Sequence, residues 1–331
     1  MLQVFRSGHP IAYFWLLVFT VVLHGGIWFA SSSTDVAPHF LFQELFEKLH
    51  ALPDVFYNLL FLLAIYLTAL LNNYFFTHFR LVPYSSLIPA FVFVLVSACL
   101  IDHQYAVGFL FSLFPLILGL LVYFNACLKE ESSAIETTFF GAFIVGIFAV
   151  LYIPAYFLLP ILLLISLIFR GPIGRELFMA TFGFFLPLLY LMAFAFLTDQ
   201  LPDLQAQLQW YALDVAEIFR KTPLFYGLFV VLLLLSFWGI GKSSQLSTQN
   251  IILHQKFVRA LSFLTLLSFL HLLILPKNEA YTGILFLAFP LSLFIGTHYL
   301  NNKTPLGLKF ILWAGILGAL VWQFGHFIFS I

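Results

Sequence analysis

The chain has 331 residues, of which 63% are hydrophobic, 19% aromatic and only 8% charged, whereas about 25% of the residues of an average soluble domain are charged. This number of charged side chains is too small to cover the surface of a water-soluble globule of this length. The composition therefore excludes an ordinary soluble enzyme and favours a lipid environment. The formal net charge is zero, which gives no electrostatic basis for binding a nucleic acid.

Apolar segments that could cross a hydrocarbon core of about 30 Å recur along the whole chain. In chain order they are 11–30, 55–77, 83–101, 105–126, 138–153, 155–169, 177–197, 222–240, 257–275, 279–298 and 307–329. Every backbone polar group in lipid must be paired internally, which helices achieve within one segment. The sequence therefore predicts an all-α fold, a polytopic transmembrane helix bundle of about 11 spans that forms one integral membrane domain over residues 1–331.

The run from 138 to 169 can be read as one span or two, because it contains no charged residue. A single helix of this length would extend about 45 Å at 1.5 Å per residue, which is too long for a bilayer without extreme tilt. Pro154 lies in the middle of the run and cannot continue a helical hydrogen-bond ladder. We therefore expect two spans, 138–153 and 155–169.

The positive charges test this division, because cytoplasmic loops of membrane proteins are enriched in Lys and Arg. With eleven crossings and a cytoplasmic N-terminus, the cytoplasmic side holds ten of the 14 cations: Arg6, Arg80, Lys129, Arg170, Arg175, Lys242, Lys256, Arg259, Lys303 and Lys309. The outer side holds Lys48, Arg220, Lys221 and Lys277. A single crossing over 138–169 would leave six cations inside and remove the bias. The charges favour eleven crossings with the N-terminus on the cytoplasmic side and the C-terminus on the outer side.

Carboxylates show the opposite distribution, since ten of the 14 fall on the predicted outer side. Most of them lie in the two longest outer loops. Residues 40–52 and 203–219 in these loops alternate apolar and polar side chains at helical spacing, which predicts two amphipathic helices that lie in the membrane interface. These helices could either roof an outward-facing cavity or serve as plain surface struts.

A few His and Asn residues occur within the predicted spans: His24, Asn72, Asn73, Asn125, His271, His298 and His326. Most lie within a turn or two of an interface, where a neutral polar side chain can form a hydrogen bond between helices. We expect them to be structural. No span contains the paired or serial charges of a proton pump or voltage sensor.

Two stretches of the chain resemble known enzymes. Residues 65–97, IYLTALLNNYFFTHFRLVPYSSLIPAFVFVLVS, and residues 140–170, FGAFIVGIFAVLYIPAYFLLPILLLISLIFR, resemble spans of the C-superfamily membrane glycosyltransferases, which use polyprenyl-phosphate-linked sugars. The order of span 11–30, Asp35 and helix 40–52 also resembles the start of these enzymes. The whole chain is similar to an uncharacterised bacterial family of polytopic inner-membrane proteins.

The resemblance implies a site at the outer face. Such a transferase needs a carboxylate as general base or as a ligand for a divalent cation, for which Asp35 is the first candidate and Asp102 the second. It also needs cations that hold the lipid phosphate, for which Arg220, Lys221 and Lys277 are the candidates. Plain flanking charge beside a span is the other interpretation of Arg220 and Lys221.

The sequence departs from these enzymes in two places. Asp35 stands alone after the first span rather than in an acidic cluster, and Tyr152 and Ile153 occupy the place of the usual Lys or Arg in the broken segment. Two functions therefore stay open. One is a glycosyltransferase-like enzyme, or a degenerate relative, and the other is a non-catalytic scaffold that assembles with other membrane subunits of the cell envelope. A lipid or solute transporter is a third, weaker alternative.

Overall fold

The computed structural model describes residues 2–6, 8–28, 53–82, 86–100, 106–129, 131–202, 204, 230–241, 252–274, 280–301 and 312–321. These residues are almost entirely helical and form no β-strand, which confirms the all-α prediction. The predicted interfacial helices 40–52 and 203–219 lie outside the described residues, apart from Leu204.

The labelled helices are α1 (Leu2–Phe5), α2 (Pro10–Leu23), η1 (Gly25–Trp28), α4 (Asp54–His78), α5 (Ile88–Leu100), α6 (Ala106–Leu128), α7 (Glu131–Leu151), η2 (Ile153–Phe157), α8 (Leu158–Arg170), α9 (Gly174–Leu197), α12 (Ile252–Ile274) and α13 (Ala280–Asn301). Two further apolar helices cover Val230–Gly241 and Leu312–Val321.

Three helices within the described residues are long and apolar enough to cross a membrane. They are Val55–His78, Ala134–Leu151 and Gly174–Leu197, with mean hydropathies of 1.9, 2.0 and 2.0. The other apolar helices are shorter over their described residues. The structure is thus consistent with a membrane protein.

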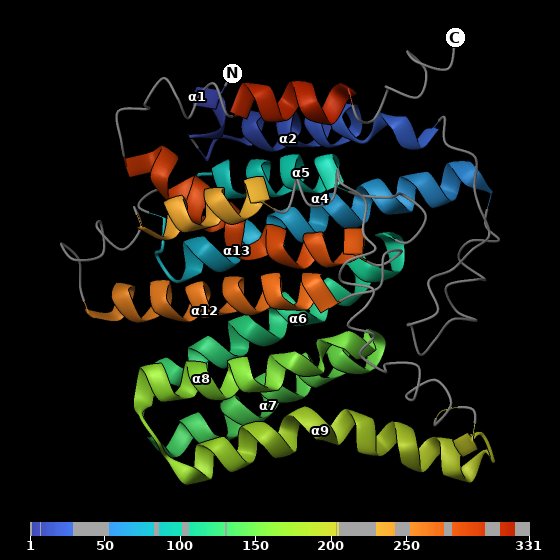
Figure 1. Ribbon diagram of the computed structural model, residues 1–331, viewed down its shortest axis with the longest axis vertical. Coiled ribbons are helices and arrows are strands. Elements are labelled where there is room, and N and C mark those ends of the chain that lie inside the picture. The colour runs from blue at the N-terminus through green and yellow to red at the C-terminus, as the bar shows by residue number, and fades with distance from the viewer. Residues whose placement is uncertain are drawn as a thin grey trace.

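The helices pack side by side in one bundle (Figure 1), with α2 and the helix Leu312–Val321 along one edge and α9 along the other. The run around Pro154 does not form one continuous helix. Helix α7 ends at Leu151, the short 3₁₀ helix η2 follows, and α8 begins at Leu158. Arg170 at the end of α8 contacts the last turn of α6, beside which α7 begins, so the chain reverses direction at η2.

Glycines allow α6, α7 and α9 to approach closely. A Cβ added at Gly141 of α7 would lie 2.7 Å from the backbone nitrogen of Tyr123 in α6, and one added at Gly183 of α9 would lie 2.6 Å from the carbonyl oxygen of Phe139 in α7. Both distances are too short for a real Cβ contact. Small residues at such interfaces let helix backbones pack at short range, which is the usual basis of helix association in lipid.

Phenylalanine rings fill the end of the bundle where α4, α6, α8 and α12 converge. The ring of Phe257, which is 1% exposed, lies 4.8 Å from Phe79, 5.0 Å from Phe124 and 4.9 Å from Phe169 between ring centroids. Phe79 directly follows α4, and the other three rings come from α6, α8 and α12. Aromatic pairs of this kind contribute about 0.5–1.5 kcal/mol beyond the burial of their surface, so this cluster ties the four helices together.

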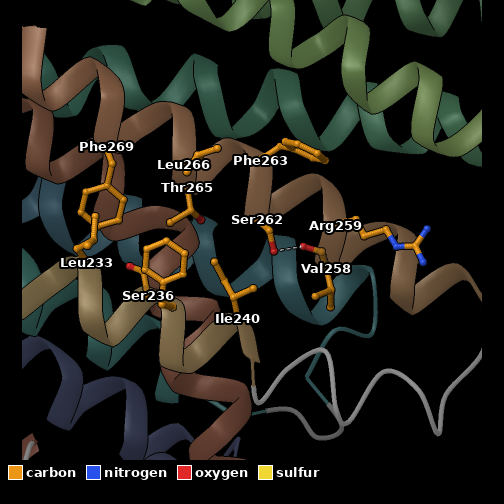
Figure 2. A pocket seen from close by; sticks show the side chains of 11 residues that line it. Leu233, Ser236, Ile240, Val258, Arg259, Ser262, Phe263, Thr265, Leu266 and Phe269 are labelled. Atoms are coloured by element: carbon orange, nitrogen blue, oxygen red, sulfur yellow. Dashed lines mark hydrogen bonds between the residues drawn. The ribbon is translucent and has the colours of Figure 1, made fainter.

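Helix Val230–Gly241 packs beside α12 and α13. At Gly239 an added Cβ would lie 2.8 Å from the Cβ of Phe294 in α13. Between this helix and α12 an apolar pocket of about 330 Å³ remains (Figure 2). Helix α9 lies at one edge of the bundle. Only 22% of its most apolar stretch is buried against the rest of the protein.

Candidate functional site

The five site residues predicted from the sequence lie outside the described residues. Asp35 falls in 29–52, Asp102 in 101–105, Arg220 and Lys221 in 205–229, and Lys277 in 275–279. The structure does describe the helix ends that lead into two of these segments. Helices α2 and η1 precede the segment with Asp35, and α5 precedes the segment with Asp102.

A buried polar contact joins α2 and α5 near these ends. Ser97 Oγ of α5 lies 3.2 Å from Nε2 of His24 at the C-terminal end of α2, and both residues are completely buried. The other ring nitrogen of His24, Nδ1, lies 3.0 Å from the carbonyl oxygen of Thr20. A nitrogen that bonds a carbonyl oxygen must carry the proton, so the neutral ring offers Nε2 to the Ser97 hydroxyl as an acceptor.

A serine next to a histidine could in principle act as an activated nucleophile. Here the arrangement does not support that chemistry, because both side chains are fully buried and no substrate can reach the hydroxyl. Ser97 Oγ also lies 2.8 Å from the carbonyl oxygen of Val94, so its single proton has two competing acceptors. The pair of His24 and Ser97 therefore positions two helix ends and has no catalytic role in this arrangement.

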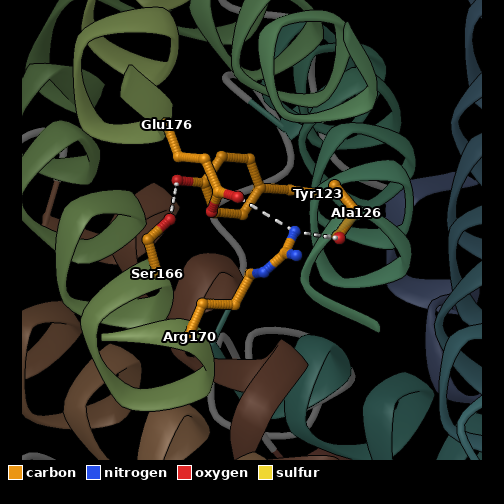
Figure 3. A network of polar contacts seen from close by, with 5 residues as sticks. All are labelled: Tyr123, Ala126, Ser166, Arg170 and Glu176. Atoms are coloured by element: carbon orange, nitrogen blue, oxygen red, sulfur yellow. Dashed lines mark hydrogen bonds and ion pairs between the residues drawn. The ribbon is translucent and has the colours of Figure 1, made fainter. Parts of the chain in front are cut away.

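A second polar network lies where α6, α8 and α9 meet (Figure 3). Arg170 Nη1 at the end of α8 lies 3.0 Å from Oε1 of Glu176 in the first turns of α9, and the two side chains are 10% and 3% exposed. Nη1 also donates to the carbonyl oxygen of Ala126 in α6, at 3.4 Å. Nearby, the hydroxyl of Tyr123 lies 2.7 Å from Ser166 Oγ and 3.0 Å from the carbonyl oxygen of Leu162.

This network has the features of a structural link. Gly171 has a positive φ of 85°, which a residue without a Cβ adopts most easily, and it turns the chain sharply between α8 and α9. The turn brings Glu176 back to Arg170, so the two charges neutralise each other where water is scarce. Removing one partner from a buried ion pair typically costs about 3–5 kcal/mol. The network therefore fixes the angle between α8 and α9.

Cations bind the C-terminal carbonyl groups of three helices. Arg170 donates to the carbonyl oxygen of Ala126 near the end of α6. Arg6 Nη2 donates to Leu300 O near the end of α13 at 3.0 Å, and Lys256 Nζ donates to Phe169 O near the end of α8 at 2.7 Å. The last carbonyl groups of a helix lack partners within it and carry partial negative charge. Arg6, Arg170 and Lys256 all belong to the group that the sequence places on the cytoplasmic side.

The polar residues within the predicted spans mostly connect helices. Asn72 Nδ2 of α4 donates to Ser292 Oγ of α13 at 2.8 Å, and His78 Nε2 lies 3.1 Å from Asn125 Oδ1 of α6. The ring of His271 stacks on Phe157 of η2 with centroids 4.2 Å apart. These contacts fit the structural role expected for such residues.

Within the part of the chain that the structure describes, no group of three or more His, Cys, Asp or Glu residues could hold a metal ion. The divalent cation implied by the enzyme resemblance stays a prediction that concerns Asp35 and Asp102. Cys127 of α6 is a buried free thiol, and it packs as a small apolar residue.

The buried ion pair of Arg170 and Glu176 was not predicted from the sequence, because Arg170 was assigned only to the cytoplasmic cations. A usable signal was present. A basic residue ends one apolar run, a Gly-Pro turn follows at 171–172, and an acidic residue begins the next run. The contact of His24 with Ser97 had no such signal, since the two residues are far apart in sequence.

Comparisons with models of protein families, with curated proteins and with solved structures find no match to this chain.

Proposed function

We propose that this protein is a glycosyltransferase-like enzyme of the bacterial inner membrane, which acts at the outer face on a polyprenyl-phosphate-linked sugar. Asp35 is the first candidate for the carboxylate of the site, and Asp102 is the second. Arg220, Lys221 and Lys277 bind the phosphate of the lipid carrier. Membrane lipids surround the bundle. A divalent cation, if the enzyme uses one, would be held by Asp35 or Asp102 and would help to activate the acceptor hydroxyl.

The observation that carries the proposal is the contact between His24 and Ser97. This contact holds the end of α2 beside the end of α5, and these helices precede the segments that contain Asp35 and Asp102. Asp102 follows Ser97 by five residues, and Asp35 follows His24 by eleven. A chain extends at most about 3.5 Å per residue, so five residues span at most about 18 Å and eleven residues at most about 39 Å. Both carboxylates can therefore belong to one site.

In the proposed reaction, the oxygen of the acceptor's hydroxyl group attacks the anomeric carbon of the sugar. A carboxylate takes up the proton of that hydroxyl group as the attack proceeds. The bond between that carbon and the phosphate oxygen breaks, and polyprenyl phosphate leaves with the bonding electrons. Arg220, Lys221 and Lys277 stabilise the negative charge that develops on this leaving group.

The proposed topology has eleven crossings, a cytoplasmic N-terminus and a periplasmic C-terminus. Two observations support it. The break at η2 divides the run 138–169 into two helices of opposite direction, and Arg6, Arg170 and Lys256 each bind a carbonyl group at the end of a helix that runs toward the cytoplasm in this topology.

The test compares Asp35→Asn and Asp102→Asn with Asp199→Asn. Asp199 is exposed, lies on the same predicted side and has a positive φ of 57° that Asn also tolerates, so it is a matched control. We expect purified Asp35→Asn to lose release of polyprenyl phosphate from its sugar-linked form, with Asp199→Asn unaffected. Normal release by Asp35→Asn at an equal protein amount would remove the catalytic assignment.

A second candidate function is a non-catalytic scaffold for a cell-envelope complex. The exposed face of α9 favours it, because large apolar side chains there lie open to lipid or to a partner span: Phe178, Phe182, Leu189, Tyr190, Phe194 and Phe196. A scaffold should purify in mild detergent with a stoichiometric membrane partner. Purification as a solitary monomer, together with an inactive Asp35→Asn variant, would exclude it.

A further inference from the structure

The pocket between helix Val230–Gly241 and α12 combines an apolar wall with a cation at one end (Figure 2). Its volume of about 330 Å³ is in the range of ligand sites, about 300–1,000 Å³. Side chains from each helix recur at helical spacing, so one face of each helix forms the wall. Leu233, Phe237 and Ile240 line one side, and Val258, Leu266 and Phe269 line the other.

Arg259 lies at the end of this pocket, and its guanidinium group extends away from the apolar wall. The residue is exposed, and it forms no ion pair with any residue that the structure describes. Phe269 follows ten residues later, about 15 Å along the axis of α12. The pocket is therefore charged at one end and apolar at the other.

Ser236 adds an independent observation. It is 2% exposed, it lines the pocket, and its Oγ has no hydrogen-bond partner within the described part of the chain. The hydroxyls of Ser262 and Thr265 on the opposite wall each donate to the carbonyl oxygen four residues earlier, at 2.7 Å. A buried hydroxyl without a partner is unfavourable, so a bound acceptor at Ser236 would stabilise the site.

We propose that this pocket binds one anionic diacyl phospholipid. The phosphate pairs with Arg259, an ester carbonyl oxygen accepts the hydrogen bond of Ser236, and an acyl chain lies along Leu233 and Phe269. Figure 2 shows Arg259 at one end of the pocket and Ser236, Leu233 and Phe269 toward the other, with Val258 and Ile240 between them. A lipid whose phosphate is held at Arg259 therefore places its acyl chain on the apolar walls. In the proposed topology Arg259 is cytoplasmic, so the lipid belongs to the inner leaflet and the site is separate from the outer carboxylates.

The test counts lipids on the intact protein by native mass spectrometry, after detergent has removed the loosely bound lipid. The probe is phosphatidylglycerol, with phosphatidylcholine and polyprenyl phosphate as competitors. We expect the wild-type protein to retain one phosphatidylglycerol in preference to both competitors. Preferential retention of polyprenyl phosphate would overturn the assignment, because the occupant would then be an isoprenoid chain.

Two variants separate the contribution of Arg259 to lipid binding from that of Ser236. Arg259→Gln should weaken retention of phosphatidylglycerol by about tenfold or more, and Ser236→Ala by about two- to tenfold. Arg259→Lys, which keeps the charge, should retain the lipid, and Arg175→Gln is the control because Arg175 is an exposed arginine on α9 away from the pocket. Thermal melting in detergent verifies that each variant is folded. Unchanged retention by folded Arg259→Gln would contradict the proposal.

Discussion

Arg170 and Glu176 form an ion pair of 3.0 Å across the turn from α8 to α9, with almost no exposure to solvent. We predict that Glu176→Gln destabilises the protein by about 3–5 kcal/mol, because Arg170 would keep its charge in a buried place where its remaining partner among the described residues is the carbonyl oxygen of Ala126. The measurement is thermal or denaturant unfolding in detergent.

The adjacent Arg175 provides the control for this prediction. It is exposed, so Arg175→Gln should change the free energy of unfolding by less than about 0.5 kcal/mol. The double variant Arg170→Met with Glu176→Leu should recover most of the loss, since it removes both buried charges together. Equal free energies of unfolding for Glu176→Gln and Arg175→Gln would show that the ion pair does not stabilise the fold.

Gly183→Ala should destabilise the contact between α7 and α9. Its new Cβ would meet the carbonyl oxygen of Phe139 at 2.6 Å, and backbone atoms in a packed helix pair cannot move aside cheaply. Overpacking of this kind costs about 1–3 kcal/mol. Gly318→Ala is the matched control, because nothing lies within 4 Å of its added Cβ and alanine is the better helix former. A stable Gly183→Ala protein would mean that the two helices are less tightly packed.

Lys256→Met should lower the free energy of unfolding by about 1 kcal/mol, because it removes the charged donor from the carbonyl oxygen of Phe169 at the end of α8. Lys256→Arg should keep most of this stability. In the control, Lys129→Met, the lost contact is an exposed one to Thr137 Oγ1, and its effect should be near zero. Melting curves that rank Lys129→Met below Lys256→Met would reverse the expectation.

Ser97→Ala and His24→Ala should show coupling in a double-mutant cycle. The two side chains share one buried hydrogen bond of 3.2 Å, so we expect an interaction energy of about 0.5–1.5 kcal/mol. Additive losses in the free energy of unfolding would argue that α2 and α5 are not held together by this pair. They would also weaken the case that the helices preceding the segments with Asp35 and Asp102 end side by side.

Local features of the fold were predictable from the sequence. The all-helical character follows from apolar runs in a chain that is 8% charged, and Pro154 indicated the break between α7 and α8 because its ring cannot continue the helix. The tight contacts at Gly141 and Gly183 were not predictable, since a glycine in an apolar run does not reveal which neighbouring helix approaches it.

Long-range polar contacts escaped the sequence for the same reason. Asn72 and Ser292 are separated by 220 residues, and no local pattern pairs them. The pocket beside Ser236 was equally hidden, because its two walls come from different helices and the missing partner of the hydroxyl is a property of packing. The predicted outer residues Asp35, Asp102, Arg220, Lys221 and Lys277 stay predictions.

The most direct test of the central claim, an outer site that contains Asp35 and Asp102, is labelling of single cysteines in spheroplasts. Cys99 and Cys127 are first replaced by Ser, and Asp35→Cys, Asp102→Cys and the cytoplasmic control Lys129→Cys are then treated with a membrane-impermeant maleimide. The account predicts that Asp35→Cys and Asp102→Cys react in intact spheroplasts, whereas Lys129→Cys reacts only after permeabilisation. Reaction of Asp35→Cys or Asp102→Cys only after permeabilisation would contradict it.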